Sequence, residues 1–267
     1  MRITFSMVKE CFLLVFSDLD GTLIDHETYT WDDAQEALAR LRDMDAGLVL
    51  ASSKTASEVV AIRTALAQEA WPAIVENGAG LLPPFAADAP ASSEYERIRL
   101  VLSDMPADLR QHFRGFGDLG TAELCQITGL DTVAAQRAQQ RSFSEPGLWF
   151  GSKDAKIRFL ATLREQGISA QQGGRFLTLS FGRNKADQMR DIIGTYQPRY
   201  TVALGDAPND IAMLEHADFG IIVTNPHGPP LPRLIREDQG RVTRTQVAGP
   251  VGWNRALLDL IDRLDLN

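Results

Sequence analysis

Two carboxylates stand one residue apart in the stretch DLDGT, directly after the apolar run CFLLVF. The run predicts a strand buried on both faces, and charge at the end of such a strand is costly to bury. Asp20, two residues further along and in the turn that follows the strand, is expected to point differently from Asp18 and to take a different role. An ordinary turn is the alternative, since Asp and Gly both favour turns.

Polar side chains also follow other predicted strands. SSKT begins at Ser52 after the run GLVLA, ENGA follows a short third strand, and GDAPND holds Asp206 after YTVAL. In an open parallel sheet the carboxyl ends of the strands lie along one edge, where ligands bind. We therefore expect Asp18, Asp20, Ser52 and Asp206 to converge.

This set of side chains predicts chemistry on a phosphate. Clustered carboxylates repel one another, and a divalent cation relieves that repulsion. Mg²⁺ prefers oxygen ligands and is commonly held by one or two carboxylates together with a substrate phosphate. Asp18 and Asp206 are the predicted ligands, and Asp20 is free to act as a general acid and base. Ser52 offers a hydroxyl and Lys185 a point charge to a phosphate oxygen.

Each motif on its own also has a structural interpretation. SSKT can cap the helix predicted from Thr55, Lys185 can be a solvated helix residue, and GDAPND can precede a helix with Pro208 in its first turn. Any single motif favours that interpretation. Their joint occurrence, each at a strand end or a helix start, favours a shared site.

An alternation of strands and helices frames these motifs. Strands are predicted at 12–16, 47–51, 73–75, 200–204 and 219–223, and helices at 31–44, 55–68, 185–194, 208–216 and 253–266. The pattern is typical of the α/β class with a doubly wound parallel sheet.

The middle of the chain lacks this regular alternation of strands and helices, and it begins with the Pro- and Ala-rich stretch LLPPFAADAPASS. Strands are predicted at 95–102, 142–150, 168–172 and 175–181, and helices at 106–116, 121–140 and 153–166. This mixture predicts an inserted α+β domain over residues 85–182, which interrupts a core formed by residues 1–84 and 183–267.

Composition and charge exclude several kinds of partner. The 267 residues are 44% hydrophobic and carry a net charge of −8, which makes the chain a poor electrostatic partner for nucleic acid or an anionic membrane. No apolar run approaches the ~18 residues needed to span a bilayer, so we expect a cytoplasmic protein. The two cysteines, Cys11 and Cys125, are too few for a disulfide framework and are expected to act as small apolar residues. The oligomeric state has no signature in the sequence.

Taken together, the four motifs resemble the haloacid dehalogenase superfamily of phosphatases. DLDGTL resembles its first motif, in which the first Asp is the nucleophile and the second the general acid and base, here Asp18 and Asp20. Ser52 in ASSK matches the second motif, whose hydroxyl binds the transferring phosphoryl group. Lys185 matches the lysine of the third motif, and GDAPND resembles the fourth, which completes a Mg²⁺ site with Asp206.

The resemblance implies a covalent mechanism. Asp18 attacks phosphorus to give an aspartyl-phosphate, while Asp20 protonates the leaving oxygen and then activates water. Mg²⁺ would be held by the Asp18 and Asp206 carboxylates and the Asp20 backbone carbonyl. Asn209 and Asp210 would orient this shell.

The insertion lies at the same point in the chain as in superfamily members with an α+β cap of type C2B. Among these members, the sequence most resembles the mannosyl-3-phosphoglycerate phosphatase family. The motifs that carry this likeness are SSKT, ENGA, GDAPND, SEP at 144–146 and GGRF at 173–176. The likeness implies a substrate with a phosphate, a carboxylate and sugar hydroxyls, and a cap that sets specificity. The Arg175 guanidinium can bind a carboxylate or phosphate through two hydrogen bonds, and backbone N–H groups of glycines can approach an anion closely. Glu145 can accept hydrogen bonds from sugar hydroxyls. The predicted substrate-binding residues are Lys54, Glu145, Gly173, Gly174 and Arg175.

The expected reaction is therefore hydrolysis of mannosyl-3-phosphoglycerate or glucosyl-3-phosphoglycerate to the glycosylglycerate, a compatible solute, and phosphate. The alternatives are a phosphatase for sucrose phosphate or a hexose phosphate, a phosphomutase, and a non-catalytic binding protein on the same fold. The intact pair Asp18 and Asp20 disfavours the last, because a binder need not keep a nucleophile beside an acid–base group.

Overall fold

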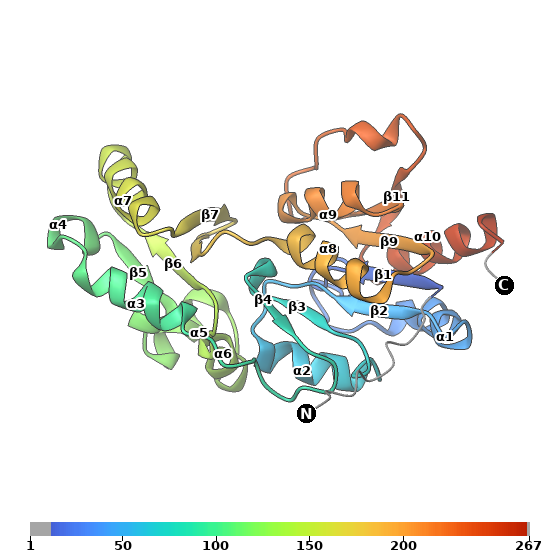
Figure 1. Ribbon diagram of the computed structural model, residues 1–267, viewed down its shortest axis with the longest axis horizontal. Coiled ribbons are helices and arrows are strands. Elements are labelled where there is room, and N and C mark those ends of the chain that lie inside the picture. Colours follow the sequence, from blue (N-terminus) through green and yellow to red (C-terminus); the bar gives the residue numbers. More distant parts are fainter. Residues whose placement is uncertain (1–11, 266–267) are drawn as a thin grey trace, which may run out of the picture. The chain divides into compact units, whose positions relative to one another are not determined.

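The structure is a computed structural model that describes residues 12–265 (Figure 1). The chain divides into two compact units. The described part of the first unit comprises residues 12–52, 70–74 and 185–265, and the second unit comprises residues 53–69 and 75–184. The predicted insertion, 85–182, falls within the second unit, while the predicted domain boundaries stay a prediction.

A five-stranded parallel sheet with the order β11-β10-β9-β1-β2 forms the centre of the first unit. Its strands are β1 (Leu13–Ser17), β2 (Gly47–Leu50), β9 (Tyr200–Gly205), β10 (Phe219–Thr224) and β11 (Val242–Ala248). All five residues of β1 are buried, as expected for a central strand covered on both faces. Beyond β2, Ala51 forms a parallel bridge to Ile74 in β3 (Ala73–Val75). The predicted α/β class with a parallel sheet is confirmed.

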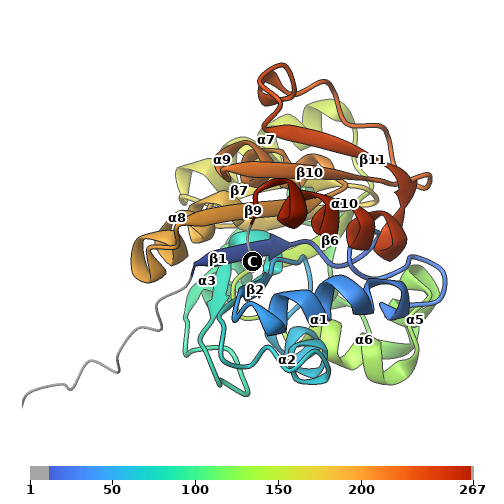
Figure 2. The same ribbon diagram turned by 90° about the vertical axis from the view of Figure 1, so that its right-hand side faces the viewer.

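Helices cover both faces of this sheet. They are α1 (Gln35–Asp43), α8 (Lys185–Tyr196), α9 (Ile211–His216) and α10 (Gly249–Arg263). α1 and α10 pack against each other in front of the sheet in Figure 2, and α8 and α9 pack together on its other face. The sequence does not predict β11, because only Val242 of its seven residues is buried and the strand lacks an apolar run.

A four-stranded antiparallel sheet with the order β5-β6-β8-β7 organises the second unit. Its strands are β5 (Phe113–Gly115), β6 (Glu145–Trp149), β7 (Ser169–Gly173) and β8 (Phe176–Ser180), and β4 (Gly80–Leu82) also belongs to the unit. Its helices are α2 (Ala56–Ala65), α3 (Glu94–Asp104), α4 (Ala107–Arg110), α5 (Thr121–Thr128), α6 (Thr132–Gln139) and α7 (Lys153–Glu165). Residues of α3, α4 and α7 share an apolar core with the sheet, and a smaller core joins α5 to α6.

The helix α2 belongs to this unit because it packs against α6. Thr55 caps α2 in a capping box with Glu58, and the Thr55 hydroxyl also donates to the backbone carbonyl of Arg137 at 2.9 Å. The structural interpretation of SSKT as a helix cap is therefore correct for Thr55.

Three predicted elements of the second unit are wrong. Residues 95–102 form a helix and not a strand, because alternation would place residues 98, 100 and 102 on one face, yet Ile98 and Leu102 are buried while Leu100 is 61% exposed. The helix predicted at 106–116 is confined to α4 and is followed by β5. The helix predicted at 121–140 is two helices, since Gly129 ends α5 in the left-handed conformation with φ of 82°.

Two further expectations concern membranes and cysteines. Within residues 12–265, no helix has the length and apolar character needed to cross a membrane. Cys125 is a partly buried free thiol that packs against the small core of α5 and α6, as predicted for a small apolar residue. Cys11 lies outside the described residues.

Candidate active site

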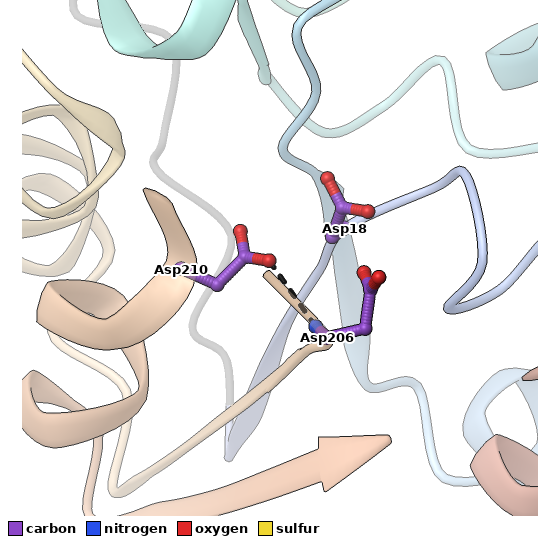
Figure 3. A group of neighbouring side chains, drawn as sticks. All are labelled: Asp18, Asp206 and Asp210. Atoms are coloured by element: carbon purple, nitrogen blue, oxygen red, sulfur yellow. Dashed lines mark hydrogen bonds between the residues drawn. The ribbon is translucent and has the colours of Figure 1, made fainter. Parts of the chain in front are cut away.

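Strand ends of the first unit bring three aspartates together, as Figure 3 shows. Asp18 follows β1, Asp206 follows the adjacent strand β9, and Asp210 stands four residues further on. Each offers one oxygen within 4.8 Å of those of the other two, and all three residues are buried. The convergence of Asp18 and Asp206 that the parallel sheet predicts is therefore present.

Lys185 is the cation of this cluster. It is the first residue of α8, and its side chain is 1% exposed. Its Nζ donates to Asp18 Oδ1 at 2.5 Å and to Asp210 Oδ1 at 2.7 Å. Burial would lower the pKa of Lys185, but the two carboxylates outweigh burial and raise it, so the group is an ammonium ion. The interpretation of Lys185 as a solvated helix residue is wrong.

Asp210 is held by the protein through both oxygens. Oδ2 accepts from the backbone N–H of Asp206 at 3.2 Å, as Figure 3 shows. Oδ2 also accepts from the N–H of Ala207 at 3.1 Å, while Oδ1 accepts from Lys185. Gly205 makes this loop possible, because a Cβ there would lie 2.5 Å from Cβ of Asp210. Asp210 thus fixes the backbone that carries Asp206, which agrees with an orienting role. Asn209 lies partly buried in the same loop.

Asp206 is oriented by two residues that sequence reasoning missed. Thr22 Oγ1 donates to Asp206 Oδ1 at 2.7 Å, and Asn225 Nδ2 donates to Asp206 Oδ2 at 2.5 Å. Burial and the charge of Asp210 raise the pKa of Asp206, and these two donors oppose the rise. Asn225 follows β10, so a polar residue at the end of the next strand was the available signal.

The electrostatics of Asp18 reflect an excess of negative charge. Burial raises the pKa of Asp18 well above its usual range, and Asp210 and Asp206 raise it further, while Lys185 lowers it. Three carboxylates and one ammonium group make an oxygen-rich, buried, anionic set. This donor set fits Mg²⁺, which binds oxygen ligands and offsets such charge.

The remaining predicted core residues lie at the same strand ends. Asp20 is half-buried in the loop after β1 and bridges to Ile24. Gly21 has φ of +80°, and a Cβ there would lie 3.2 Å from Asp206 Oδ2, so the turn requires glycine. Ser52 is buried after β2, and its N–H donates to the carbonyl of Ile74 at 2.9 Å. The catalytic roles predicted for Asp20 and Ser52 stay predictions.

The predicted substrate residues of the second unit do not form one cluster. Gly173 ends β7, and Gly174 and Arg175 form the exposed turn to β8, where Arg175 Nη1 donates to the Ile127 carbonyl at 2.8 Å. Both glycines face open space, since a Cβ at either position would have no atom of the described chain within 4 Å beyond its immediate neighbours. Glu145 pairs with Leu179, at the far end of β8 from this turn.

Glu145 itself is a buried carboxylate. Its Oε1 accepts from the N–H of Gly117 at 2.9 Å and from Arg99 Nη1 at 3.1 Å. Burial raises its pKa, and Gly117, Tyr95 and Arg99 oppose the rise. Its side chain has no exposed surface within the unit, so it shapes this part of the sheet.

Glu76 of the ENGA motif has a clear structural role. Glu76 is buried and has a positive φ of 51°. Its carboxylate accepts from the N–H of Ser142 at 2.9 Å and of Ser144 at 2.8 Å, from Ser144 Oγ at 2.7 Å, and it lies 3.2 Å from Arg141 Nε. Glu76 thus fixes the segment that leads into β6. Lys54 is half-buried, and its carbonyl accepts from the Glu76 N–H at 2.9 Å.

Known proteins are similar to this chain in sequence and in fold. The model of the haloacid dehalogenase-like hydrolase family matches residues 15–90 and 156–228. A glucosyl-3-phosphoglycerate/mannosyl-3-phosphoglycerate phosphatase of Methanococcoides burtonii is 31% identical to this chain, over 94% of this chain and 97% of that protein.

Two solved structures illustrate the likeness in fold. The sucrose-phosphatase of Synechocystis, solved with sucrose and phosphate, has a TM-score of 0.61 and 19% identity, covering 96% of this chain and 98% of that one. The sugar phosphatase BT4131 of HAD subclass IIB has a TM-score of 0.62 and 15% identity, covering 95% and 99%. With the family match and the 31% identical relative, these findings show that the chain belongs to the haloacid dehalogenase-like hydrolases and has the fold of their subclass IIB phosphatases.

Proposed function

We propose that this protein is a Mg²⁺-dependent phosphatase that hydrolyses mannosyl-3-phosphoglycerate or glucosyl-3-phosphoglycerate to the glycosylglycerate and phosphate. The observation that carries the chemistry is the buried cluster of Asp18, Asp206 and Asp210 around the ammonium group of Lys185. A cluster this anionic repels a phosphate ester unless a further cation is bound. The cluster therefore supports a site for metal-assisted phosphoryl transfer and disfavours a purely structural turn.

The metal would be held by the Asp18 and Asp206 carboxylates and the Asp20 backbone carbonyl. Asp210 would orient this site, because its oxygens accept from Lys185 and from the two backbone N–H groups of the loop that carries Asp206. When bound, Mg²⁺ neutralises charge on the transferring phosphoryl group and polarises it.

Catalysis would proceed through an aspartyl-phosphate on Asp18. The Asp18 carboxylate forms a bond to phosphorus as the bond from phosphorus to the glycerate oxygen breaks, and Asp20 gives its proton to that oxygen. Asp20 then takes a proton from the water that attacks phosphorus. This second step breaks the bond to Asp18, releases phosphate and restores both carboxyl groups. Lys185 and Ser52 would stabilise charge on the phosphoryl oxygens.

The substrate assignment is supported by the relative from Methanococcoides burtonii, whose similarity spans 94% of this chain and so includes the second unit. We propose that this unit is the cap that selects the sugar. Lys54, Gly173, Gly174 and Arg175 would contact the substrate, whereas the buried Glu145 would act by shaping the cap sheet.

A phosphate-release screen tests the proposal. It compares mannosyl-3-phosphoglycerate, glucosyl-3-phosphoglycerate, sucrose phosphate and hexose phosphates, each with and without Mg²⁺. The expected result is Mg²⁺-dependent release from a glycosyl-3-phosphoglycerate. Turnover of sucrose phosphate or a hexose phosphate alone would refute the substrate, and an active Asp18→Asn variant would refute the mechanism.

A further inference from the structure

The hydroxyl of Ser17, the last residue of β1, connects Trp253 of α10 to the backbone of Asp18. Ser17 is completely buried. Its Oγ accepts from Trp253 Nε1 at 2.9 Å and donates to the backbone carbonyl of Asp18 at 2.7 Å. An indole nitrogen only donates, so the direction of this chain of hydrogen bonds is fixed from Trp253 through Ser17 to Asp18.

The other backbone group of Asp18 is fixed as well. Its N–H donates to the carbonyl of Leu204 in β9 at 2.9 Å. With the N–H held by the sheet and the C=O held by Ser17, the peptide groups on both sides of the Asp18 Cα have defined orientations. The direction of the Asp18 side chain follows from the backbone that carries it.

Asp18 needs such support because its surroundings push its carboxylate away. The carboxylates of Asp206 and Asp210 both lie close enough to share a metal site with it, and like charges at such distances repel. Lys185 attracts the same carboxylate from one side at 2.5 Å. A side chain under opposed forces keeps one position only if its backbone is rigid.

We propose that Ser17 and Trp253 are positioning residues for the nucleophile, and that α10 thereby takes part in catalysis without touching the substrate. The inference rests on the proposed function, in which Asp18 attacks phosphorus. Trp253 is fully buried and lies 235 positions from Asp18, outside every motif of the site. Its role is to fix the Ser17 hydroxyl in the orientation that donates to Asp18.

The test uses the full chain with Mg²⁺ and p-nitrophenyl phosphate, a probe that does not depend on the sugar specificity of the cap. Ser17→Ala should lower kcat on the order of tenfold with KM within about twofold, because a small displacement of a reacting group slows the chemical step. Trp253→Phe should lower kcat less, since Ser17 keeps its hydroxyl. The double variant should be no slower than Ser17→Ala, because both changes break one chain of hydrogen bonds.

Matched variants separate positioning from general destabilisation. Thr201→Val removes a buried hydroxyl from β9 that bonds to Asp218, and Trp71→Phe makes the same change at another buried tryptophan of the first unit. Both should lower the melting temperature and leave kcat within about twofold. The inference is supported if kcat falls only in the Ser17 and Trp253 variants.

Equal losses of kcat in the controls would overturn the inference, as would wild-type kcat in Ser17→Ala or additive effects in the double variant. Ser17→Ala removes a single oxygen, so the test does not depend on whether Trp253→Phe folds. The variant Asp18→Asn distinguishes a failure of the proposed function from a failure of the positioning role. An active Asp18→Asn variant would overturn the proposed function itself, whereas an inactive one beside an unaffected Ser17→Ala would overturn the positioning role alone.

Discussion

Lys185 Nζ lies 2.5 Å from Asp18 Oδ1, although the two residues are 167 positions apart in the chain. The same ammonium group lies 2.7 Å from Asp210 Oδ1, and neither the lysine nor Asp210 has appreciable exposure. A buried ion pair of this kind is weak evidence for added stability, because desolvation offsets much of the attraction. Breaking it from one side is costly, since a charge is then left buried without its partner.

Lys185→Met should therefore affect both stability and turnover. The substitution shortens the unbranched side chain by one atom and leaves the carboxylates uncompensated, so the free energy of unfolding should fall by about 3–5 kcal/mol. The loss of a cation at the phosphoryl group should lower kcat by about a hundredfold or more. Urea unfolding and phosphate release measure the two effects.

The control is Lys156→Met, which removes a half-buried lysine whose Nζ donates to the neutral Gln172 Oε1 at 3.1 Å. It should change the free energy of unfolding by no more than about 0.5 kcal/mol. If Lys185→Met behaved like this control, the buried ion pair would not exist in solution.

Mg²⁺ should stabilise the protein in a pH-dependent way. The pKa values of Asp18 and Asp206 are raised above the ordinary value of 3.8, chiefly by burial. The folded state thus binds these protons more tightly than the unfolded state. The associated stability is complete below pH 3.8 and is lost as the pH rises through the folded-state pKa values. Bound Mg²⁺ requires the deprotonated carboxylates, so it should restore stability at the pH where the protons are gone.

The measurement is the melting temperature with and without Mg²⁺ between pH 5 and 8. At a free Mg²⁺ concentration 100 times Kd, the stabilisation should reach about 2.7 kcal/mol, and it should shrink towards acid pH. Asp206→Asn should abolish the Mg²⁺ response. An unchanged response in Asp206→Asn, or one that grows as the pH falls, would place the cation elsewhere.

The sequence predicts the nucleophile and its strand-end neighbours because these depend on local patterns. An apolar run followed by polar residues marks the end of a buried parallel strand, and parallel strands share one edge for their carboxyl ends. That pattern alone is sufficient to predict that Asp18 and Asp206 lie together. The same pattern marks Asn225 just beyond the strand predicted at 219–223, but the pattern does not reveal its contact with Asp206, because that contact depends on how two loops meet.

The second unit was less predictable, because tertiary contacts and not local sequence patterns decide its structure. Tyr95, Ile98 and Leu102 suit a strand by composition, and only packing against the antiparallel sheet of the second unit identifies the segment as a helix with one buried face. Glu76 is similar, since its partners at 142–144 lie more than sixty positions away. Tertiary contacts decided both cases, and local propensity did not.

Asp20→Asn should separate the two chemical steps. With a glycosyl-3-phosphoglycerate the leaving oxygen needs a proton, so loss of the general acid should lower kcat by about 10²–10⁴-fold. p-Nitrophenol leaves without that proton, so Asp18 should still become phosphorylated by p-nitrophenyl phosphate. Hydrolysis of the aspartyl-phosphate then lacks its base, and p-nitrophenol should appear in a burst of one equivalent per enzyme, followed by slow turnover.

Stopped-flow absorbance measures this burst. Asp88→Asn, at an exposed residue that bonds only its neighbour Ala89 in the contacts described, should show wild-type kinetics with both substrates. Equal losses with both substrates and no burst would mean that Asp20 does not act as the acid and base.

Glu76→Gln should loosen the segment that enters β6. The carboxylate accepts three backbone N–H bonds within 141–144 together with the Ser144 hydroxyl, and it pairs with Arg141. An amide keeps one acceptor oxygen but turns an NH₂ group towards some of these donors. Because buried hydrogen bonds to a charged acceptor are worth more than neutral ones, the free energy of unfolding should fall by about 2–4 kcal/mol.

Amide hydrogen exchange locates the effect, because Ser142 and Ser144 should lose protection while amides of the first unit such as Asp18 keep theirs. Glu123→Gln is the matched control, since Glu123 pairs with Arg114 at the surface of the same unit. Exposed pairs contribute little, so the control should cost less than about 1 kcal/mol and leave the exchange at Ser142 unchanged. Similar losses in both variants, or unchanged protection at Ser142 in Glu76→Gln, would show that Glu76 does not hold this segment.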